Sequence, residues 1–147
     1  MLIDKAIELW DKKYDLNCAE CILYAANEEY NLWLSKESLK IMSAFGGGMG
    51  IGSTCGAVTG ALAVIGIMFT NDRGHESPIV RQLSVEFMER FNEKFGSLDC
   101  RDIKINQISG EKTCTDMIRT SANILEEIIR ERKDYIKYNR EGEKQWI

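Results

Sequence analysis

Cysteine is the residue type in this chain whose number and placement could do chemistry. There are five: Cys18, Cys21, Cys55, Cys100 and Cys114. The N-terminus MLIDKAIELWDKK places charges among its apolar residues and lacks the continuous apolar region of a secretory signal. We therefore expect a cytoplasmic protein, in which thiols stay reduced and act as metal ligands, redox groups or small buried residues.

Three of these thiols stand where the sequence predicts that a helix begins. Cys18, Cys55 and Cys114 each follow an asparagine or a threonine, which are residue types that cap helices. The unpaired N–H groups and the positive dipole end at a helix start stabilise a thiolate and lower the thiol pKa. This pattern favours reactive or metal-binding thiols over thiols that only pack.

Two chemistries fit this set. Thiol–disulfide exchange would use the CxxC spacing of Cys18 and Cys21, although no βαβ pattern of a thioredoxin-like protein surrounds it. Alternatively, Cys18, Cys55, Cys100 and Cys114 converge on zinc or an iron–sulfur cluster, which soft thiolates suit. Four soft ligands exceed what a dithiol switch requires, which favours the metal or cluster.

A glycine-rich stretch, GGGMGIGSTCGAVTG, surrounds the central cysteine over residues 46–60. Backbone N–H groups of Gly47, Gly48, Gly50 and Gly56 are expected near Cys55, where they could cradle an anion or a cofactor. The stretch lacks the lysine of a phosphate-binding loop and therefore predicts no nucleotide site. The single histidine, His75, lies in a polar segment and is expected on the surface.

Apolar spacing predicts helices nearly everywhere, with no strand. Good caps and stops bound most of them, such as Asn17 with Glu20 at one start and Gly96 at one end. The expected helices cover residues 4–14, 17–30, 35–45, 54–70, 78–95 and a long last segment from Thr113, with an irregular stretch around Cys100.

The fold class that follows is all-α, a compact bundle of about five to six helices around a buried, Gly/Ala-rich central helix. The 147 residues, 44% of them hydrophobic, suit one domain over 1–147, with a charged tail from about residue 137. The net charge of −4 without a basic stripe predicts no nucleic-acid partner. The uncharged run from Ile41 to Asn71 is broken by glycines and predicts no membrane span.

The motifs NCAEC, GGGMGIGSTCGAVTG, FGSLDCRDI and KTCTDM follow one another along the chain. Together they resemble the bacterial and archaeal family of redox-active proteins named for its C-GCAxxG-C-C pattern, over about residues 17–130. The resemblance places the family's four cysteines on Cys18, Cys55, Cys100 and Cys114. It leaves Cys21 as an addition and puts Thr54 where the family has glycine.

Similar domains occur in electron-transfer proteins such as split-Soret cytochromes, so the resemblance implies redox activity and raises the expectation of an iron–sulfur cluster. The chain has no CxxCH motif for haem. We thus expect an oxidoreductase or electron-transfer protein, with a redox partner that the sequence does not name. It is expected to form a homodimer. The alternative is a non-catalytic helical interaction module, with buried structural cysteines and with Trp146 in a dimer surface.

Overall fold

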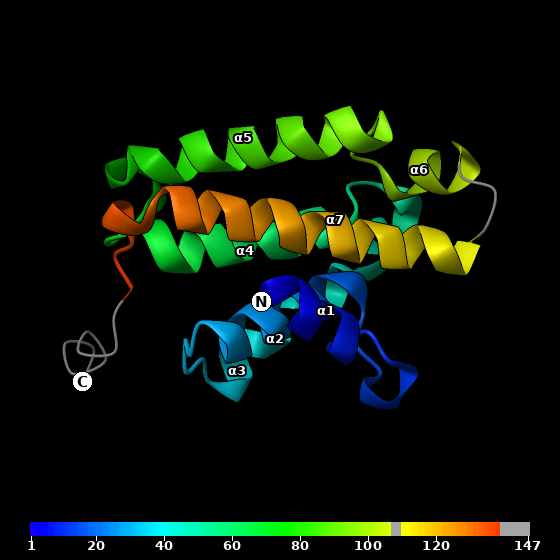
Figure 1. Ribbon diagram of the computed structural model, residues 1–147, viewed down its shortest axis with the longest axis horizontal. Coiled ribbons are helices and arrows are strands. Elements are labelled where there is room, and N and C mark those ends of the chain that lie inside the picture. The colour runs from blue at the N-terminus through cyan, green and yellow to red at the C-terminus, as the bar shows by residue number, and fades with distance from the viewer. Residues whose placement is uncertain (107–109, 139–147) are drawn as a thin grey trace.

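The structure is a computed structural model that describes residues 1–106 and 110–138, and in this part of the chain it is all-α, as predicted (Figure 1). The α-helices number seven there, one more than the upper expectation. They are α1 (Leu2–Leu9), α2 (Cys18–Glu29), α3 (Lys36–Lys40), α4 (Gly56–Phe69), α5 (Pro78–Phe95), α6 (Cys100–Asn106) and α7 (Gly110–Glu131). Shorter turns join them: η1 (Lys12–Tyr14), η2 (Ile41–Ala44), η3 (Gly48–Gly52), η4 (Gly74–Glu76) and η5 (Lys133–Tyr135).

The helix α4 is the centre of the bundle. It contacts α2, α5 and α7, and in Figure 1 α5 runs above α4 and α7 while α1, α2 and α3 lie below them. Most of its residues are buried, among them Ala57, Val58, Ala61 and Phe69. The prediction of a buried, small-residue central helix is therefore confirmed.

Close approach between α4 and α2 depends on two glycines. A Cβ atom on Gly60 would lie 2.6 Å from the carbonyl oxygen of Ala19, and one on Gly56 would lie 3.0 Å from the Cβ of Cys18. Both distances are shorter than ordinary van der Waals contact. The glycines thus bring the start of α2, with Cys18, directly against α4.

One helix start and one helix end follow the predicted cap and stop. Asn17 accepts a hydrogen bond from the Glu20 amide at 2.8 Å, and the Glu20 carboxylate accepts one from the Asn17 amide at 3.0 Å, which completes a capping box. At α5, Pro78 occupies the first turn and Gly96 ends the helix in the left-handed region, with φ of 74°.

The first predicted helix is too long. It ends at Leu9, and the following residues form the separate turn η1. The reason is Asp11, whose carboxylate accepts a hydrogen bond from the Lys13 amide at 2.9 Å and caps a new turn instead of continuing the old helix. Asp15 closes that turn in the left-handed region.

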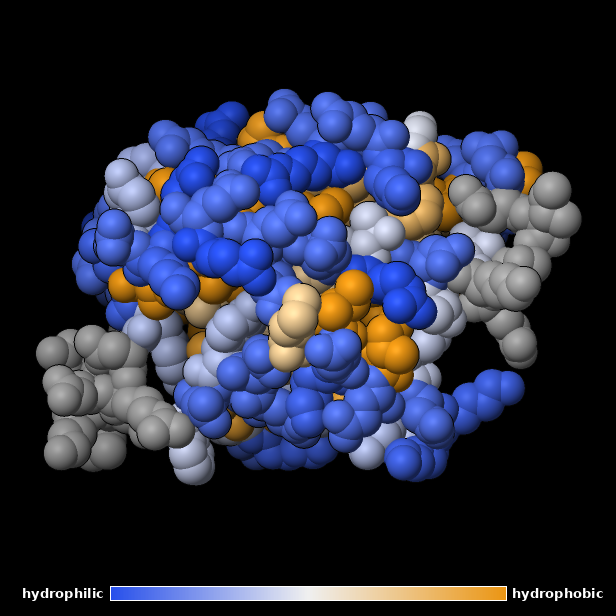
Figure 2. All heavy atoms as spheres, in the orientation of Figure 1, coloured by the Kyte–Doolittle hydropathy of each residue, from blue (hydrophilic) through white to orange (hydrophobic). Residues whose placement is uncertain are grey.

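The surface seen in Figure 2 is mostly hydrophilic, with hydrophobic atoms gathered where α1 meets α7. None of the helices within residues 1–106 and 110–138 has the length and apolar character needed to cross a bilayer. Most of the charged tail, including Trp146 and its predicted docking, lies outside the described residues.

Candidate functional site

The thiols of Cys18 and Cys55 both lie at helix starts, in different ways. Cys18 is the first residue of α2, as predicted. With Ser53 or Thr54 as the cap, Cys55 was expected in the first turn of α4. In the structure Cys55 is itself the N-cap. Its backbone stays extended because the segment before it pairs with another chain segment.

That pairing joins Cys55 to Cys100. The Cys55 amide donates to the carbonyl of Leu98 at 2.8 Å, and the Cys100 amide donates to the carbonyl of Ser53 at 2.7 Å. These bonds frame an isolated bridge between Thr54 and Asp99. Cys100, predicted in an irregular stretch, is instead the first residue of the short helix α6.

Cys114 also differs from its predicted position, because it lies further inside its helix than expected. The helix α7 begins at Gly110, so Cys114 is not its first residue and does not stand at its N-terminus. It shares a face of α7 with Met117 and Ser121, at helical spacing. Ser121 donates a buried hydrogen bond to the carbonyl of Ala57 at 2.7 Å, which holds this face of α7 against the start of α4.

Electrostatic interactions connect the four thiols of Cys18, Cys55, Cys100 and Cys114. The charges of Cys55, Cys100 and Cys114 all raise the pKa of Cys18, and Cys100 and Cys114 raise the pKa of Cys55. Such mutual influence requires the sulfurs to lie near one another. Cys55 and Cys100 are buried, whereas Cys18 and Cys114 are partly exposed.

Within this group, Cys18 and Cys114 form a hydrogen-bonded pair of unequal acidity. Their mutual hydrogen bond is the largest influence on both: it lowers the pKa of Cys114 to about 6 and raises the pKa of Cys18 well above that of an ordinary thiol. Burial raises the pKa of Cys18 further. The hydrogen bond therefore favours Cys114 as the thiolate and Cys18 as the thiol that donates to it.

Lys104 supplies a cation that acts on these thiols. It lies one helical turn after Cys100 on α6, makes a side-chain hydrogen bond to Cys100, and lowers the pKa of Cys114 by its charge. In return the negative charge on Cys114, followed by that on Cys100, raises the pKa of Lys104. The thiolate of Cys114 is therefore stabilised by a thiol and an ammonium, not by the helix start that the sequence suggested.

Cys55 lies deeper and stays protonated. Burial raises its pKa to about 11, although the amides of Ala57 and Val58 at the start of α4 act in the opposite direction. Its thiol contacts the thioether of Met117 at 3.2 Å, and both side chains are almost completely buried. Cys55 is thus a buried thiol, in contrast to the partly exposed thiols of Cys18 and Cys114.

Cys21, the accessory candidate, lies apart from this group. Its thiol donates to the carbonyl of Ala6 at 3.3 Å in the interface between α1 and α2. Burial alone raises its pKa to about 12, with no contribution from the other cysteines. The structure therefore pairs Cys18 with Cys114 and not with Cys21, its neighbour in the CxxC spacing.

The glycine-rich stretch forms a tight turn beside the site. Gly48 has φ of 61°, and a Cβ there would lie 2.5 Å from the backbone of Ser53, so only glycine fits. Arg101 on α6 donates to the carbonyl of Ile51 at 2.9 Å and ties this turn to the helix that carries Cys100. The amides that act on the Cys55 sulfur come from Ala57 and Val58. A backbone role for Gly47, Gly48, Gly50 and Gly56 at this sulfur stays a prediction.

Four thiols are a donor set that suits a soft metal or an iron–sulfur cluster. Throughout the described part of the chain, no three His, Cys, Asp or Glu side chains are grouped so that they could hold one ion. Zinc and iron–sulfur sites in proteins need three or four such ligands.

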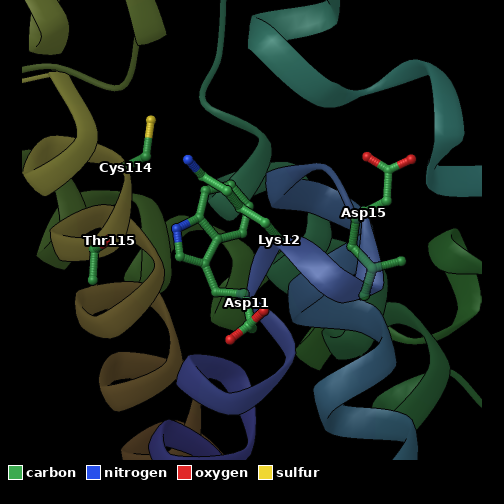
Figure 3. A pocket seen from close by; sticks show the side chains of 7 residues that line it. Asp11, Lys12, Asp15, Cys114 and Thr115 are labelled. Carbon is green, nitrogen blue, oxygen red and sulfur yellow. The ribbon is translucent and has the colours of Figure 1, made fainter.

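A groove of about 770 Å³ opens next to Cys114. Its walls come from the end of α1 and from η1 on one side and from the start of α7, with Cys114 and Thr115, on the other. In Figure 3 the sulfur of Cys114 and the ammonium of Lys12 extend toward the same space, whereas the carboxylates of Asp11 and Asp15 lie elsewhere along the groove. The low-pKa thiol is thus the one that a ligand in this groove can reach.

Sequence reasoning missed three contributors to the site. Lys104 follows Cys100 by four residues, which is a usable signal once Cys100 is placed in a helix. Met117 follows Cys114 by three residues, which places the two side chains on one face of a helix. Trp10, which lines the groove beside Cys114, gave no signal because the two residues meet only through the fold.

Comparison with known proteins places the chain in a family. The family model described as "Putative redox-active protein (C_GCAxxG_C_C)" matches residues 16–128, which is more than half of the chain and includes all four clustered cysteines. A search among curated proteins found no significant match. A search among solved structures found none either.

Proposed function

The chain belongs to the C_GCAxxG_C_C family, and on that premise we propose that it is a thiol–disulfide oxidoreductase in which Cys114 is the attacking thiolate and Cys18 the resolving thiol. The observation that carries the proposal is the hydrogen-bonded, unequally ionised pair at the edge of a groove. Exchange needs a thiolate to attack and a neighbouring thiol to release the product.

The reaction is a two-electron exchange. The Cys114 thiolate attacks one sulfur of a substrate disulfide, forms a mixed disulfide and displaces the other sulfur as a thiolate. Cys18 then loses its proton to solvent and attacks the Cys114 sulfur, which releases the second substrate thiolate. The substrate disulfide is reduced to two thiols and the protein is oxidised to a Cys18–Cys114 disulfide.

The pKa of Cys114 suits the first step. A thiol with a pKa of about 6 is mostly ionised at neutral pH and still keeps much of its nucleophilicity, which falls as the pKa falls. Cys18, with its raised pKa, stays protonated until the mixed disulfide removes the negative charge of Cys114. This order of ionisation separates the attacking role from the resolving role.

A redox titration tests the proposal. Protein equilibrated in buffers of graded thiol–disulfide ratio is expected to lose two of its five thiols in one two-electron transition. Cys18→Ser and Cys114→Ser variants should lack that transition, whereas Cys21→Ser should retain it. A transition that survives both of the first two substitutions would contradict the assignment.

Metal or cluster binding remains a second, separate expectation from the sequence. Anaerobic purification followed by metal analysis and a visible spectrum tests it directly. Stoichiometric zinc, or iron with sulfide, would overturn the dithiol proposal, because the same thiols would then be ligands. Metal-free protein with a titratable disulfide would support it.

The proposal also includes a cellular compartment and an oligomeric state. We place the protein in the cytoplasm, where reduced thiols are maintained, and as a homodimer, because Ile41, Ile51 and Ile105 are exposed apolar side chains. Sedimentation of the purified chain gives its mass in solution. If replacing all four clustered cysteines by serine left every cellular phenotype unchanged, the protein would instead be a non-catalytic interaction module.

A further inference from the structure

The groove beside Cys114 contains a fixed apolar surface. Trp10 and Leu16 line it, and both are only partly exposed because they pack against the hydrophobic core. Their positions are therefore set by the fold before any ligand arrives. A substrate that reaches Cys114 through the groove would lay part of its own surface on these two side chains.

The charged groups of the groove carry an excess of carboxylates. Asp11 and Asp15 line it together with a single ammonium, that of Lys12. The thiolate of Cys114 is a further negative charge, toward which the ammonium of Lys12 extends, and Lys104 is engaged with the cysteines. The whole chain also has a net charge of −4. The carboxylates of Asp11 and Asp15 therefore favour a positively charged group of the substrate in their part of the groove, away from Lys12.

The shape of the groove suits a polypeptide. It has room for several side chains, at about 770 Å³, and it lies open between η1 and the start of α7 instead of enclosing a cavity. Small molecules are usually held in sites that bury most of their surface. An open groove instead accepts an extended segment whose remaining parts stay in solvent.

We propose that this groove is the substrate site and that it takes a disulfide carried by a polypeptide segment in which an apolar residue and a basic residue flank the cysteine. The apolar side chain packs on Trp10 and Leu16, and the basic side chain faces Asp11 and Asp15. This inference rests on the proposed thiol–disulfide exchange. The substrate disulfide itself supplies the oxidant for that exchange, so no further reactant is needed for the half-reaction.

Blocked synthetic peptides test the inference. Each carries one cysteine as a mixed disulfide with a nitrothiol, so that attack by Cys114 on the peptide sulfur releases a coloured nitrothiolate. One pair of peptides differs only in a flanking lysine or glutamate, and a second pair only in a flanking phenylalanine or glycine. The rate of Cys114 with each peptide is divided by the rate at which a free small thiol, at equal thiolate concentration, attacks the same peptide. This ratio removes differences in the intrinsic reactivity of the peptides.

The groove predicts that the lysine peptide reacts about threefold to tenfold faster than the glutamate peptide at low ionic strength, and that salt reduces this ratio. The phenylalanine peptide should exceed the glycine peptide by about threefold or more. In an Asp11→Asn, Asp15→Asn double variant the lysine preference should fall toward one. Asparagine can still cap η1 and adopt the left-handed backbone of Asp15, so the turn is retained.

The matched control is Asp134→Asn, which removes one carboxylate in η5, after the far end of α7, and should leave the ratio unchanged. Equal normalised rates for lysine and glutamate peptides, or a preference that persists in the double variant, would overturn the groove assignment. A Cys114 that reacts with no peptide faster than the free thiol would instead overturn the proposed exchange itself.

Discussion

The hydrogen bond between Cys18 and Cys114 raises the pKa of the first thiol and lowers that of the second, and the two sulfurs have different surroundings. Cys114 is near Lys104 and opens onto the groove, whereas Cys18 is held against α4 by the close approach at Gly56. Sequence reasoning identified both thiols as candidates but attributed their acidity to helix starts. The actual partners are more than ninety residues apart in the chain, and no local pattern reports such a contact.

The first prediction concerns the pH dependence of Cys114 alkylation. Because only the thiolate reacts, the rate should rise with pH through a midpoint near 6. Cys18→Ala removes the hydrogen bond that lowers this pKa, so the midpoint should move up toward the ~8.5 of a free thiol. Iodoacetamide labelling followed by peptide mass spectrometry measures both curves. A midpoint that the substitution leaves in place would contradict the pairing.

The second prediction concerns Lys104. Lys104→Met removes the cation near the Cys114 thiolate, so the alkylation midpoint should rise and the rate at pH 6 should fall by about twofold to fivefold. Lys104→Arg keeps the charge and should restore most of the rate. Lys40→Met, which removes an ammonium from α3, serves as the control. Equal curves for the methionine and arginine variants would show that Lys104 does not act through its charge.

At the scale of elements, α4 and α6 show how far sequence patterns reach. The central helix α4 was predictable because Gly56, Gly60 and the surrounding small residues mark a buried, closely packed face. The helix α6 was not predictable, because it has only seven residues and its start is held by one backbone hydrogen bond, from the Cys100 amide to the Ser53 carbonyl. The start of α7 was placed late because Thr113 has the residue type of a cap but is buried inside the helix.

The third prediction compares two glycines of α4. Gly60→Ala would place a methyl group 2.6 Å from the Ala19 carbonyl oxygen, so α2 must move and the free energy of unfolding should fall by about 1–3 kcal/mol. Gly66→Ala is the matched control: a Cβ there meets no atom within 4 Å, and the free energy should rise by about 0.5–1 kcal/mol. Urea unfolding measures both. Equal effects would refute close packing at Gly60.

At the scale of the molecule, the site lies at one end of the bundle, where α2, α4, α6 and α7 meet (Figure 1). The fold class and the buried centre were predictable from periodicity and composition, and the choice between metal and dithiol chemistry was not. Four cysteines are compatible with either until their grouping is known. That grouping depends on how α2, α4, α6 and α7 pack, which is a property of the whole fold.

The fourth prediction concerns stability in the two redox states. A Cys18–Cys114 disulfide would link α2 to α7 across most of the chain, so it restricts the unfolded state strongly. The oxidised protein should therefore have a free energy of unfolding higher by about 2–4 kcal/mol than the reduced protein. Chemical unfolding in each state measures the difference, and Cys18→Ser should abolish it. An oxidised form less stable than the reduced one would indicate that the two thiols cannot bond without strain.

Mapping the disulfide formed on oxidation tests the central claim most directly. Reduced, metal-free protein is oxidised by a limiting amount of a small disulfide, free thiols are blocked at low pH, and the linked peptides are identified by mass spectrometry. The account predicts one bond, between Cys18 and Cys114, with Cys21, Cys55 and Cys100 recovered as blocked thiols. A bond between Cys18 and Cys21, or between Cys55 and Cys100, in place of that one would contradict it.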